Sequence, residues 1–276
     1  MNVVRHANAT KFLARAKLWL ERAEAENNVI LGIAGFFESY SGQVKPYLLT
    51  IHDNGPIVGA ALMTPPRRLL ISSMPDSAVL SLAHYLFTDT VPVPGVLGPS
   101  TCARVFAESW ITRTERTFRL KMSERLYACE FVIAAPSSPG SLRAATQNDE
   151  SLLVKWADEF CREAKIEDET AFTQAQIPNL ISKGSLYVWD NGEAVSMADL
   201  RRETAHGIAV SLVYTPPRYR NNGYATSCVA ALTKRMLDTG KRFCCLYTDL
   251  SNPTSNSIYQ RIGYQPICDV QDWVFG

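Results

Sequence analysis

The sequence lacks the features that mark several large classes of protein. No uninterrupted apolar run approaches the roughly 20 residues that a membrane span needs, so we expect no membrane partner. The formal charge of +1 at pH 7 gives no reason to expect nucleic acid as a partner. The seven cysteines show no CxxC spacing, which disfavours a zinc site and a disulfide framework. We therefore expect reduced core thiols, no metal ion and a cytoplasmic location.

The first 28 residues are basic and amphipathic, as in a targeting peptide, but they contain acidic residues that argue against that interpretation. Apolar residues recur there at helical spacing, which predicts an ordinary first helix. These residues are Phe12, Leu13, Ala16, Trp19, Leu20 and Ala23.

The patterned sequence is divided by APSSPGS at 135–141, a stretch of small and turn-forming residues. Each half contains a hairpin signal, Asn54-Gly55 or Asp190-Asn191-Gly192, followed by a longer strand, a Pro-Pro pair and a helix. We infer an internal duplication with domains at 1–138 and 139–276. A helix near 253–261 and a terminal strand pair should complete the second domain. Hairpins that flank one strand-helix-strand crossover predict a mixed α/β fold of the α+β class.

The segment TPPRYRNNGYAT contains an unusual helix start. Gly223 has no Cβ, so a ligand can approach the backbone closely, and the first amides of a helix lack internal acceptors. The helix dipole makes that end attractive to anions, and Arg220 adds a nearby cation. The pattern therefore favours a pyrophosphate held by the amides of Asn222, Gly223, Ala225 and Thr226. A helix start that merely tolerates Asn and Gly is the alternative.

Two known phosphate-binding motifs do not fit this segment. It lacks the lysine and the Ser/Thr of a P-loop, and its glycine spacing differs from that of the dinucleotide fingerprint. The missing motifs and the many hairpins both disfavour a nucleotide-binding module of another type.

The segment from Val210 to Leu232 resembles the cofactor-binding core of the GNAT superfamily, the acyl-CoA-dependent N-acyltransferases. Its signature, Arg/Gln-x-x-Gly-x-Gly/Ala, is met by Arg220, Gly223 and Ala225. A second family pattern recurs downstream in NPTSNSIYQRIGY. It is matched by Asn252, Ser255, Ile258, Tyr259, Gly263 and Tyr264. The resemblance covers about 142–275, whereas the first half looks like a degraded copy without the Arg-x-x-Gly-x-Ala pattern and is not expected to form a second cofactor site.

The resemblance implies two tandem GNAT-like domains, each a mostly antiparallel twisted sheet with flanking helices and a splayed central strand pair. The pantetheine arm would pair with strand backbone at Leu212, Val213 and Tyr214. The loop after the strand would hold the pyrophosphate, with Arg218 as a further cation or a solvated residue. This loop comprises Arg220, Asn221, Asn222, Gly223, Tyr224, Ala225 and Thr226.

The implied reaction is the direct attack of an amine on the thioester of acetyl-CoA in a ternary complex. A strand N–H near Val213 would stabilise the oxyanion. The leaving thiolate would take its proton from Tyr259, whose phenol with an ordinary pKa of about 10 is protonated at pH 7. Asn252 would touch the cofactor or its bound water, or else only cap the helix, and Asn256 would be structural.

The general base is not marked by the sequence. The strand GIAVSLVYT carries no carboxylate, although many GNAT proteins have one there. Asp249, just past the next strand, is the first candidate, and Glu203 and His206 follow. Each is also a plausible solvated turn residue, and ordered water is a further route for the amine's proton.

The function expected from these observations is acyl transfer to a primary amine, mainly of a small molecule, by a monomer or a homodimer. Acetyl-CoA is the expected acyl donor. The alternative is a protein of the same fold that binds acyl-CoA without catalysis, as a sensor or assembly partner.

Overall fold

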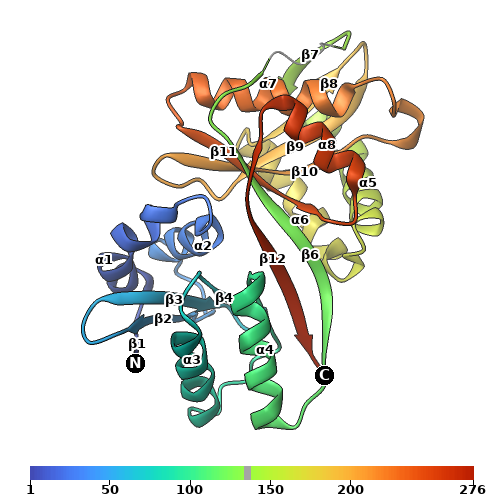
Figure 1. Cartoon of the computed structure of the whole chain (residues 1–276). Coiled ribbons are helices and arrows are strands. Elements are labelled where there is room, and N and C mark those ends of the chain that lie inside the picture. Colours follow the sequence, from blue (N-terminus) through green and yellow to red (C-terminus); the bar gives the residue numbers. More distant parts are fainter. Residues whose placement is uncertain (134–137) are drawn as a thin grey trace. The chain divides into compact units, whose positions relative to one another are not determined.

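The computed structural model describes residues 1–133 and 138–276 (Figure 1). By their internal contacts the residues form two compact units, which we call unit 1 and unit 2. Unit 1 comprises Met1–Leu126, Asp249–Ser251 and Ile267–Gly276, and unit 2 comprises Tyr127–Thr248 and Asn252–Pro266. Part of the predicted break, 135–137, lies outside the described residues.

The two halves of the chain repeat one order of elements, β-α-α-β-β-β-α-β-α-β, as the duplication predicts. The first half contains β1 (Asn2–Arg5), α1 (Ala9–Leu20), α2 (Asn28–Glu38), β2 (Tyr47–His52), β3 (Ile57–Met63), β4 (Leu69–Ile71), α3 (Asp76–Thr88), β5 (Gly95–Pro99), α4 (Ser100–Thr114) and β6 (Phe118–Cys129). The second contains β7 (Ser141–Ala144), α5 (Glu150–Glu163), α6 (Thr170–Ser182), β8 (Leu186–Asp190), β9 (Ala194–Arg201), β10 (Gly207–Tyr214), α7 (Tyr224–Asp238), β11 (Phe243–Asp249), α8 (Pro253–Ile262) and β12 (Gln265–Phe275).

The strands pair mainly in antiparallel fashion, which confirms the mixed α+β class. In unit 1 the strands follow the order β1-β2-β3-β4-β5-β12, and in unit 2 the order is β11-β10-β9-β8-β7. Each unit has a parallel pair, β4 with β5 and β10 with β11, joined through a helix. Both predicted hairpins are present, β2-β3 around Asn54-Gly55 and β8-β9 around Asn191-Gly192.

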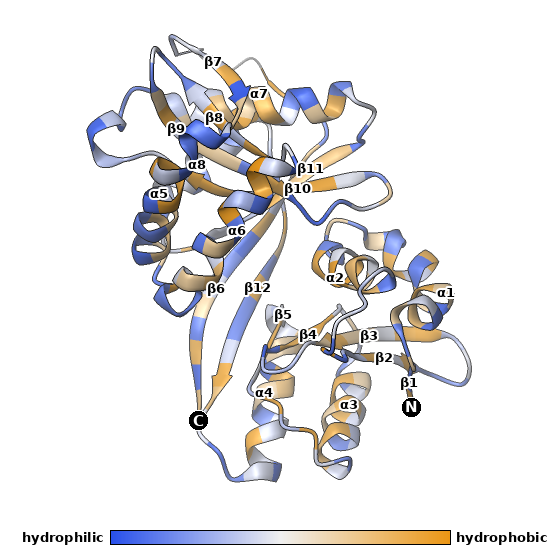
Figure 2. Cartoon of the chain, turned by 180° about the vertical axis from the view of Figure 1, so that it is seen from behind, coloured by the Kyte–Doolittle hydropathy of each residue, from blue (hydrophilic) through white to orange (hydrophobic). Residues whose placement is uncertain are grey.

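Each sheet is covered on both faces by helices with one apolar and one polar side (Figure 2). In unit 2, α7 and α8 pack through residues such as Val229 and Leu232 on one face, and α5 and α6 pack through Trp156 and Ile177 on the other. In unit 1, α3 and α4 share one core and α1 and α2 the other. None of the helices in 1–133 and 138–276 combines the length and the apolar character that crossing a bilayer requires.

The end of the chain differs from the prediction. The expected terminal strand pair is wrong, because Gln265–Phe275 is one strand of 11 residues. Its last part pairs with β5, from Val270 opposite Pro99 to Val274 opposite Gly95. A Cβ on Gly95 would lie 2.2 Å from the carbonyl oxygen of Trp273, so glycine permits this pairing. Most of this strand, from Ile267 onward, therefore belongs to unit 1 by its contacts. The predicted domains, 1–138 and 139–276, stay a prediction.

The start of unit 2 is held by a cluster of ion pairs. Arg143 on β7 donates two hydrogen bonds to the carboxylate of Asp149, at 2.8 and 2.9 Å, and one to Asp190 at 2.7 Å. Thr146 and Asp149 also form a capping box. The hydrogen bonds from Arg143, followed by those from Thr146, lower the pKa of Asp149 to about 2.

We expect the charge of Asp149 to stabilise the protein at neutral pH. Its pKa is lower in the folded chain than its ordinary 3.8, so this contribution is present above pH 3.8 and is lost as the pH falls towards 2. Asp149→Asn should therefore lower the free energy of unfolding at pH 7 by about 1 kcal/mol, allowing for solvent screening, and by less at pH 3. Urea denaturation at the two pH values measures this. The same substitution at Asp158, a part-exposed partner of Arg162 on α5, is the control. A loss for Asp149→Asn that does not vary with pH would contradict the argument.

Candidate functional site

The connection from β10 to α7 forms an exposed turn. After Pro216, a short 3₁₀ helix covers Pro217–Tyr219, and Arg220 then returns to an extended conformation. Asn221 and Gly223 have positive φ angles of 63° and 76°. A Cβ on Gly223 would lie 2.7 Å from Ser138 Oγ, whose hydroxyl donates to the carbonyl oxygen of Asn222 at 2.6 Å. The turn therefore favours glycine at 223 both for its φ and for the space around it.

The first amides of α7 have no acceptor in the part of the chain that the structure describes. Ser227 N–H donates to the carbonyl oxygen of Gly223 at 3.0 Å, but those of Tyr224, Ala225 and Thr226 donate to no described residue. Gly223 provides no side-chain cap. With a helix of 15 residues behind it, this end presents free donors and a partial positive charge. It has the features of an anion site that the sequence predicts.

Arg220, the predicted phosphate cation, contacts a carboxylate. Its Nη2 lies 2.7 Å from both carboxylate oxygens of Glu163 on α5, and its Nε donates to the carbonyl oxygen of Thr215 at 2.9 Å. Both side chains of the ion pair are partly exposed. Arg218 lies over the ring of Tyr219, 4.5 Å from its centre. Glu163 was missed by the sequence reasoning, because an acidic residue in the last turn of an amphipathic helix is expected simply to face solvent.

The two parallel strands of unit 2 are paired at their start and part towards their ends. The pairs run from Gly207 opposite Phe243 to Ala209 opposite Cys245, although both strands continue. On its other side, β10 keeps its pairing with β9 but gains one residue between Ser211 and Tyr214. Leu212, in this bulge, has a φ of 49°. A leucine in this conformation is strained, and such strain is typically found at functional sites.

The side chains at the bulge pack into the protein. Leu212 and Tyr214 join the core under α5 and α6, and Val213 packs towards the core under α7 and α8. The Tyr214 hydroxyl donates to Glu159 at 3.1 Å. Burial, followed by these contacts with Glu159 and by the charge of Glu163, raises the pKa of Tyr214. These three residues thus have their side chains occupied, and what they can offer a ligand is backbone.

Tyr259 on α8 is a buried phenol in the same unit. Its ring meets that of Tyr264 edge to face, with 5.9 Å between centroids, and its side chain is part of the core with Cys228 and Val229. The hydroxyl forms no hydrogen bond with any described residue. Burial, followed by the nearby thiol of Cys228, raises the pKa of Tyr259. The phenol is therefore protonated at neutral pH, as a proton donor must be.

The polar residues at the start of α8 are engaged in its structure. Asn252 caps the helix by accepting from the backbone N–H of Ser255 at 3.0 Å. Asn256 accepts from the hydroxyl of Tyr127 at 2.9 Å and donates to the carbonyl oxygen of Asn252 at 2.7 Å. Both structural roles considered from the sequence are thus present, and contact of Asn252 with a cofactor stays a prediction.

The candidate bases also have local partners. Asp249 accepts from the backbone N–H of Ser251 at 2.7 Å and is grouped by its contacts with unit 1. Glu203 lies 2.6 Å from Lys241 Nζ, and the carbonyl oxygen of His206 accepts from Arg242 N–H at 2.7 Å. Among the described residues, none of these three forms a hydrogen bond or an ion pair with Tyr259, and their roles stay predictions.

One buried carboxylate was missed by the sequence reasoning. Asp199 on β9 is fully buried, lies opposite Ser211 of the bulge and pairs with Arg201. The signal for it was an acidic residue within the otherwise apolar strand AVSMADL, where burial of a charge is costly without a partner.

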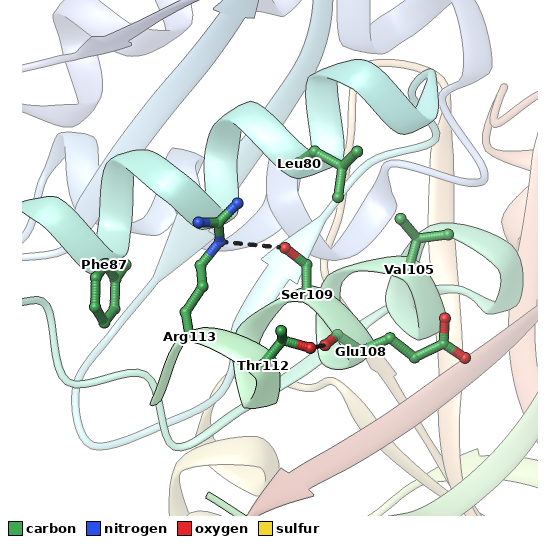
Figure 3. Close-up of a pocket in the computed structure, with 7 residues that line it drawn as sticks. All are labelled: Leu80, Phe87, Val105, Glu108, Ser109, Thr112 and Arg113. Atoms are coloured by element: carbon green, nitrogen blue, oxygen red, sulfur yellow. Dashed lines mark hydrogen bonds between the residues drawn. The ribbon is translucent and has the colours of Figure 1, made fainter. Parts of the chain in front are cut away.

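A pocket of about 640 Å³ lies between α3 and α4 in unit 1 (Figure 3). It is lined by exposed apolar residues such as Leu80 and Phe87 and by polar ones such as Ser109 and Arg113. None of the predicted site residues lines it, so it is separate from the residues discussed above.

The comparisons with known proteins agree with this geometry. Residues 190–274, which contain β10, the turn, α7 and α8, match the family described as FR47-like protein. A GCN5-related N-acetyltransferase from Sphaerobacter thermophilus has a TM-score of 0.64 at 15% identity, covering 99% of this chain and 95% of that one. The chain has the GNAT fold.

Two further solved structures match the whole chain. A GNAT-family acetyltransferase from Colwellia psychrerythraea has a TM-score of 0.60 at 13% identity, covering 100% of this chain and 99% of that one. A tandem GNAT protein from the clavulanic acid biosynthesis pathway has a TM-score of 0.55 at 9% identity, covering 100% and 98%. No curated protein matches the sequence. The expected tandem arrangement of the GNAT fold is thereby confirmed.

The buried environment of Tyr259 can be tested by titration. Because burial raises its pKa, Tyr259 should stay protonated while tyrosines of ordinary pKa, about 10, ionise. Tyr259→Phe should therefore leave the rise in absorbance of ionised tyrosine between about pH 9 and 11 unchanged. A difference spectrum of the two proteins measures this. Loss of one tyrosine's share of that rise would show that the Tyr259 phenol is accessible to solvent.

Proposed function

We propose that the protein transfers an acetyl group from acetyl-CoA to a primary amine of a small molecule. The observation that carries this proposal is the set of amides at Tyr224, Ala225 and Thr226, which donate to no described residue and lie at the end of the turn that follows β10, a strand that parts from its parallel neighbour. The amides suit a pyrophosphate, and the unpaired backbone of β10 suits the pantetheine amides, which would pair with it like an added strand. The match of residues 190–274 to FR47-like protein supports this reading of the same segment.

In the proposed reaction, the neutral amine attacks the thioester carbonyl carbon and a C–N bond forms. A backbone N–H at the bulge near Val213 stabilises the oxyanion. The tetrahedral intermediate then collapses, the C–S bond breaks, and Tyr259 gives its proton to the thiolate. Tyr259 supports this role because it is protonated and its hydroxyl has no competing partner among the described residues. Asp249 or ordered water takes the amine's proton.

A second candidate function is binding of acyl-CoA without catalysis. One observation favours it: β10 has no carboxylate to serve as a base. An acyl-CoA sensor would need the turn and the parted strands but neither a base nor Tyr259. The two functions therefore differ in their response to substitution of Tyr259.

Coenzyme binding at the turn can be tested with paired glycine substitutions. Gly184, between α6 and β8, has a φ of 65° and open space around it, and Gly223 has a φ of 76°. Both Gly→Ala substitutions should cost about 1–2 kcal/mol of stability, because both force an L-residue into a left-handed conformation. Only Gly223→Ala should also weaken acetyl-CoA binding, by about tenfold or more, since its methyl group displaces Ser138 and crowds the turn.

Calorimetry with acetyl-CoA and thermal unfolding of the two variants measure these effects. Equal affinity in the Gly223→Ala and Gly184→Ala proteins would mean that the coenzyme's phosphates are not bound at this turn.

The role of Tyr259 can be tested by thiol release. Across a panel of primary amines, Tyr259→Phe should reduce kcat by about 100-fold, the lower end for loss of a positioned acid, and change acetyl-CoA affinity less than twofold. Another phenol of this core, Tyr264, bonds to Thr233 at 2.7 Å, so Tyr264→Phe is the control for packing. Unchanged turnover in Tyr259→Phe would remove Tyr259 from the mechanism. Acetyl-CoA binding without thiol release from any amine would favour the sensor.

A further inference from the structure

A pocket of about 710 Å³ lies in unit 1, beside β1, the β2-β3 turn and the first turns of α1. This volume is within the range of sites for small molecules. Its polar side chains are those of Asn2, His6, Lys11, Arg15, His52 and Asn54. All of them belong to unit 1, and none takes part in the proposed acetyl transfer.

Two histidines of this pocket are joined through a buried hydroxyl. Thr50 Oγ1 lies 2.9 Å from His6 Nε2 and 2.9 Å from His52 Nε2, and His52 Nδ1 lies 2.9 Å from the carbonyl oxygen of Gly55. A carbonyl oxygen only accepts, so His52 Nδ1 carries a hydrogen. With neutral rings, Thr50 then donates to His52 Nε2 and accepts from His6 Nε2–H. This chain directs the other nitrogen of His6, Nδ1, to take up any further proton.

The charges around His6 have one sign. Lys11 and Arg15 form no ion pair with any described residue, and no aspartate or glutamate lines the pocket. Burial, followed by the nearby His52 and Arg15, lowers the pKa of His6. Among the described residues no group of three His, Cys, Asp or Glu side chains could hold a metal ion, here or elsewhere. The pocket thus has cations and hydrogen-bond donors but no anion.

The corresponding edge of unit 2 is arranged differently. There β7 pairs with β8 as β1 pairs with β2, and the basic residue of the edge, Arg143, is neutralised by Asp149 and Asp190. The duplicated scaffold therefore accommodates carboxylates at this edge. By the matching bonds of His6 N to Leu48 O and of Ala145 N to Leu186 O, the positions of Asp149 and Asp190 correspond to Thr10 and His52 in unit 1. Neither is a carboxylate, so Lys11 and Arg15, which form no ion pair with a described residue, can take an anion from outside the chain.

We propose that this pocket binds the phosphate monoester group of a small molecule between Lys11, Arg15 and His6. Two permanent cations match the double negative charge of a phosphate monoester, whereas a carboxylate would leave one of them uncompensated. Arg15 can bind two phosphate oxygens through its planar guanidinium group, and Lys11 acts as a point charge. His6, protonated at Nδ1 when the anion enters, adds a third donor.

Binding should be linked to protonation. The charged and titratable groups that line the pocket with His6 are Lys11 and Arg15 of α1 and His52 of β2. Arg15 and His52 oppose protonation of His6, and Lys11 adds a charge of the same sign. A bound dianion reverses the sign of the local field, so the pKa of His6 rises on binding. The chain has four histidines, so the ring signals of His6 can be followed separately by NMR.

The test uses the whole protein and its histidine ring signals, titrated against pH in chloride and in the presence of phenyl phosphate, inorganic phosphate or acetate at equal ionic strength. We expect phenyl phosphate and inorganic phosphate to saturate the shifts of His6 and raise its pKa, and acetate to do neither. His84 on α3 should not respond. Tighter binding of phenyl phosphate would identify an ester as the ligand, whereas stronger binding of inorganic phosphate would identify the free ion and overturn the monoester assignment.

Substitutions locate the site. Arg15→Gln and Lys11→Gln should each weaken phenyl phosphate binding about tenfold, because each removes a charge-assisted contact. Lys17→Gln, on the same helix and outside the pocket lining, is the matched control and should leave binding unchanged. Circular dichroism shows whether each variant is folded. Equal weakening by all three substitutions, or no response of His6 to phosphate, would overturn the proposal. Acetyl-CoA binding measured on the same proteins should be unaffected, so failure here is distinct from failure at α7.

Discussion

The parting of β10 from β11 is the constraint on which the candidate site depends. After Ala209 and Cys245 the strands no longer pair, and the bulge at Leu212 turns β10 while it stays bonded to β9. A residue in such a conformation costs about 1–3 kcal/mol, so its surroundings must hold it. Packing of Leu212 under α5 and α6 does so, together with the Ser196 hydroxyl, which donates to the carbonyl oxygen of Tyr214 at 3.1 Å. The unpaired backbone is therefore a stable feature of the fold.

The turn before α7 is supported differently on its two sides. Ser138 binds the inner side, since its N–H donates to Ser227 Oγ at 2.9 Å and its hydroxyl to Asn222. On the outer side the contact is an ion pair of Arg220 with Glu163, in which both side chains are about half exposed. An exposed pair of this kind contributes about 0–1 kcal/mol. A pyrophosphate at the amides would therefore compete with Glu163 for Arg220 at small cost, while the turn keeps its shape.

Local signals account for what the sequence predicted well. The Asn-Gly pairs at 54–55 and 191–192 predicted both hairpins. Apolar residues spaced about 3.6 residues apart predicted helices such as α1 and α5. The positive φ of Leu212 had no local signal, because leucine normally avoids it and contacts distant in the sequence, with α5, α6 and Ser196, hold it there. The partner of Arg220 and the pairing of β12 with β5 were missed for the same reason. Both join residues far apart in the sequence, and contacts of that kind leave no periodic pattern.

The two halves differ at the parallel strand pair and the helix between its strands, which form the candidate site in unit 2. In unit 1, β4 ends at Ile71 beside Gly98 of β5, where an added Cβ would lie 2.7 Å from the carbonyl oxygen of Ile71. These strands thus stay close, unlike β10 and β11. α3 begins after Pro75, whose carbonyl oxygen accepts from the N–H groups of Ala78 and Val79, and no glycine turn precedes it. The strained and open elements of unit 2 have been replaced by packed ones in unit 1. The cations of unit 1 that form no ion pair with a described residue, Lys11 and Arg15, lie at another edge, between β1 and α1.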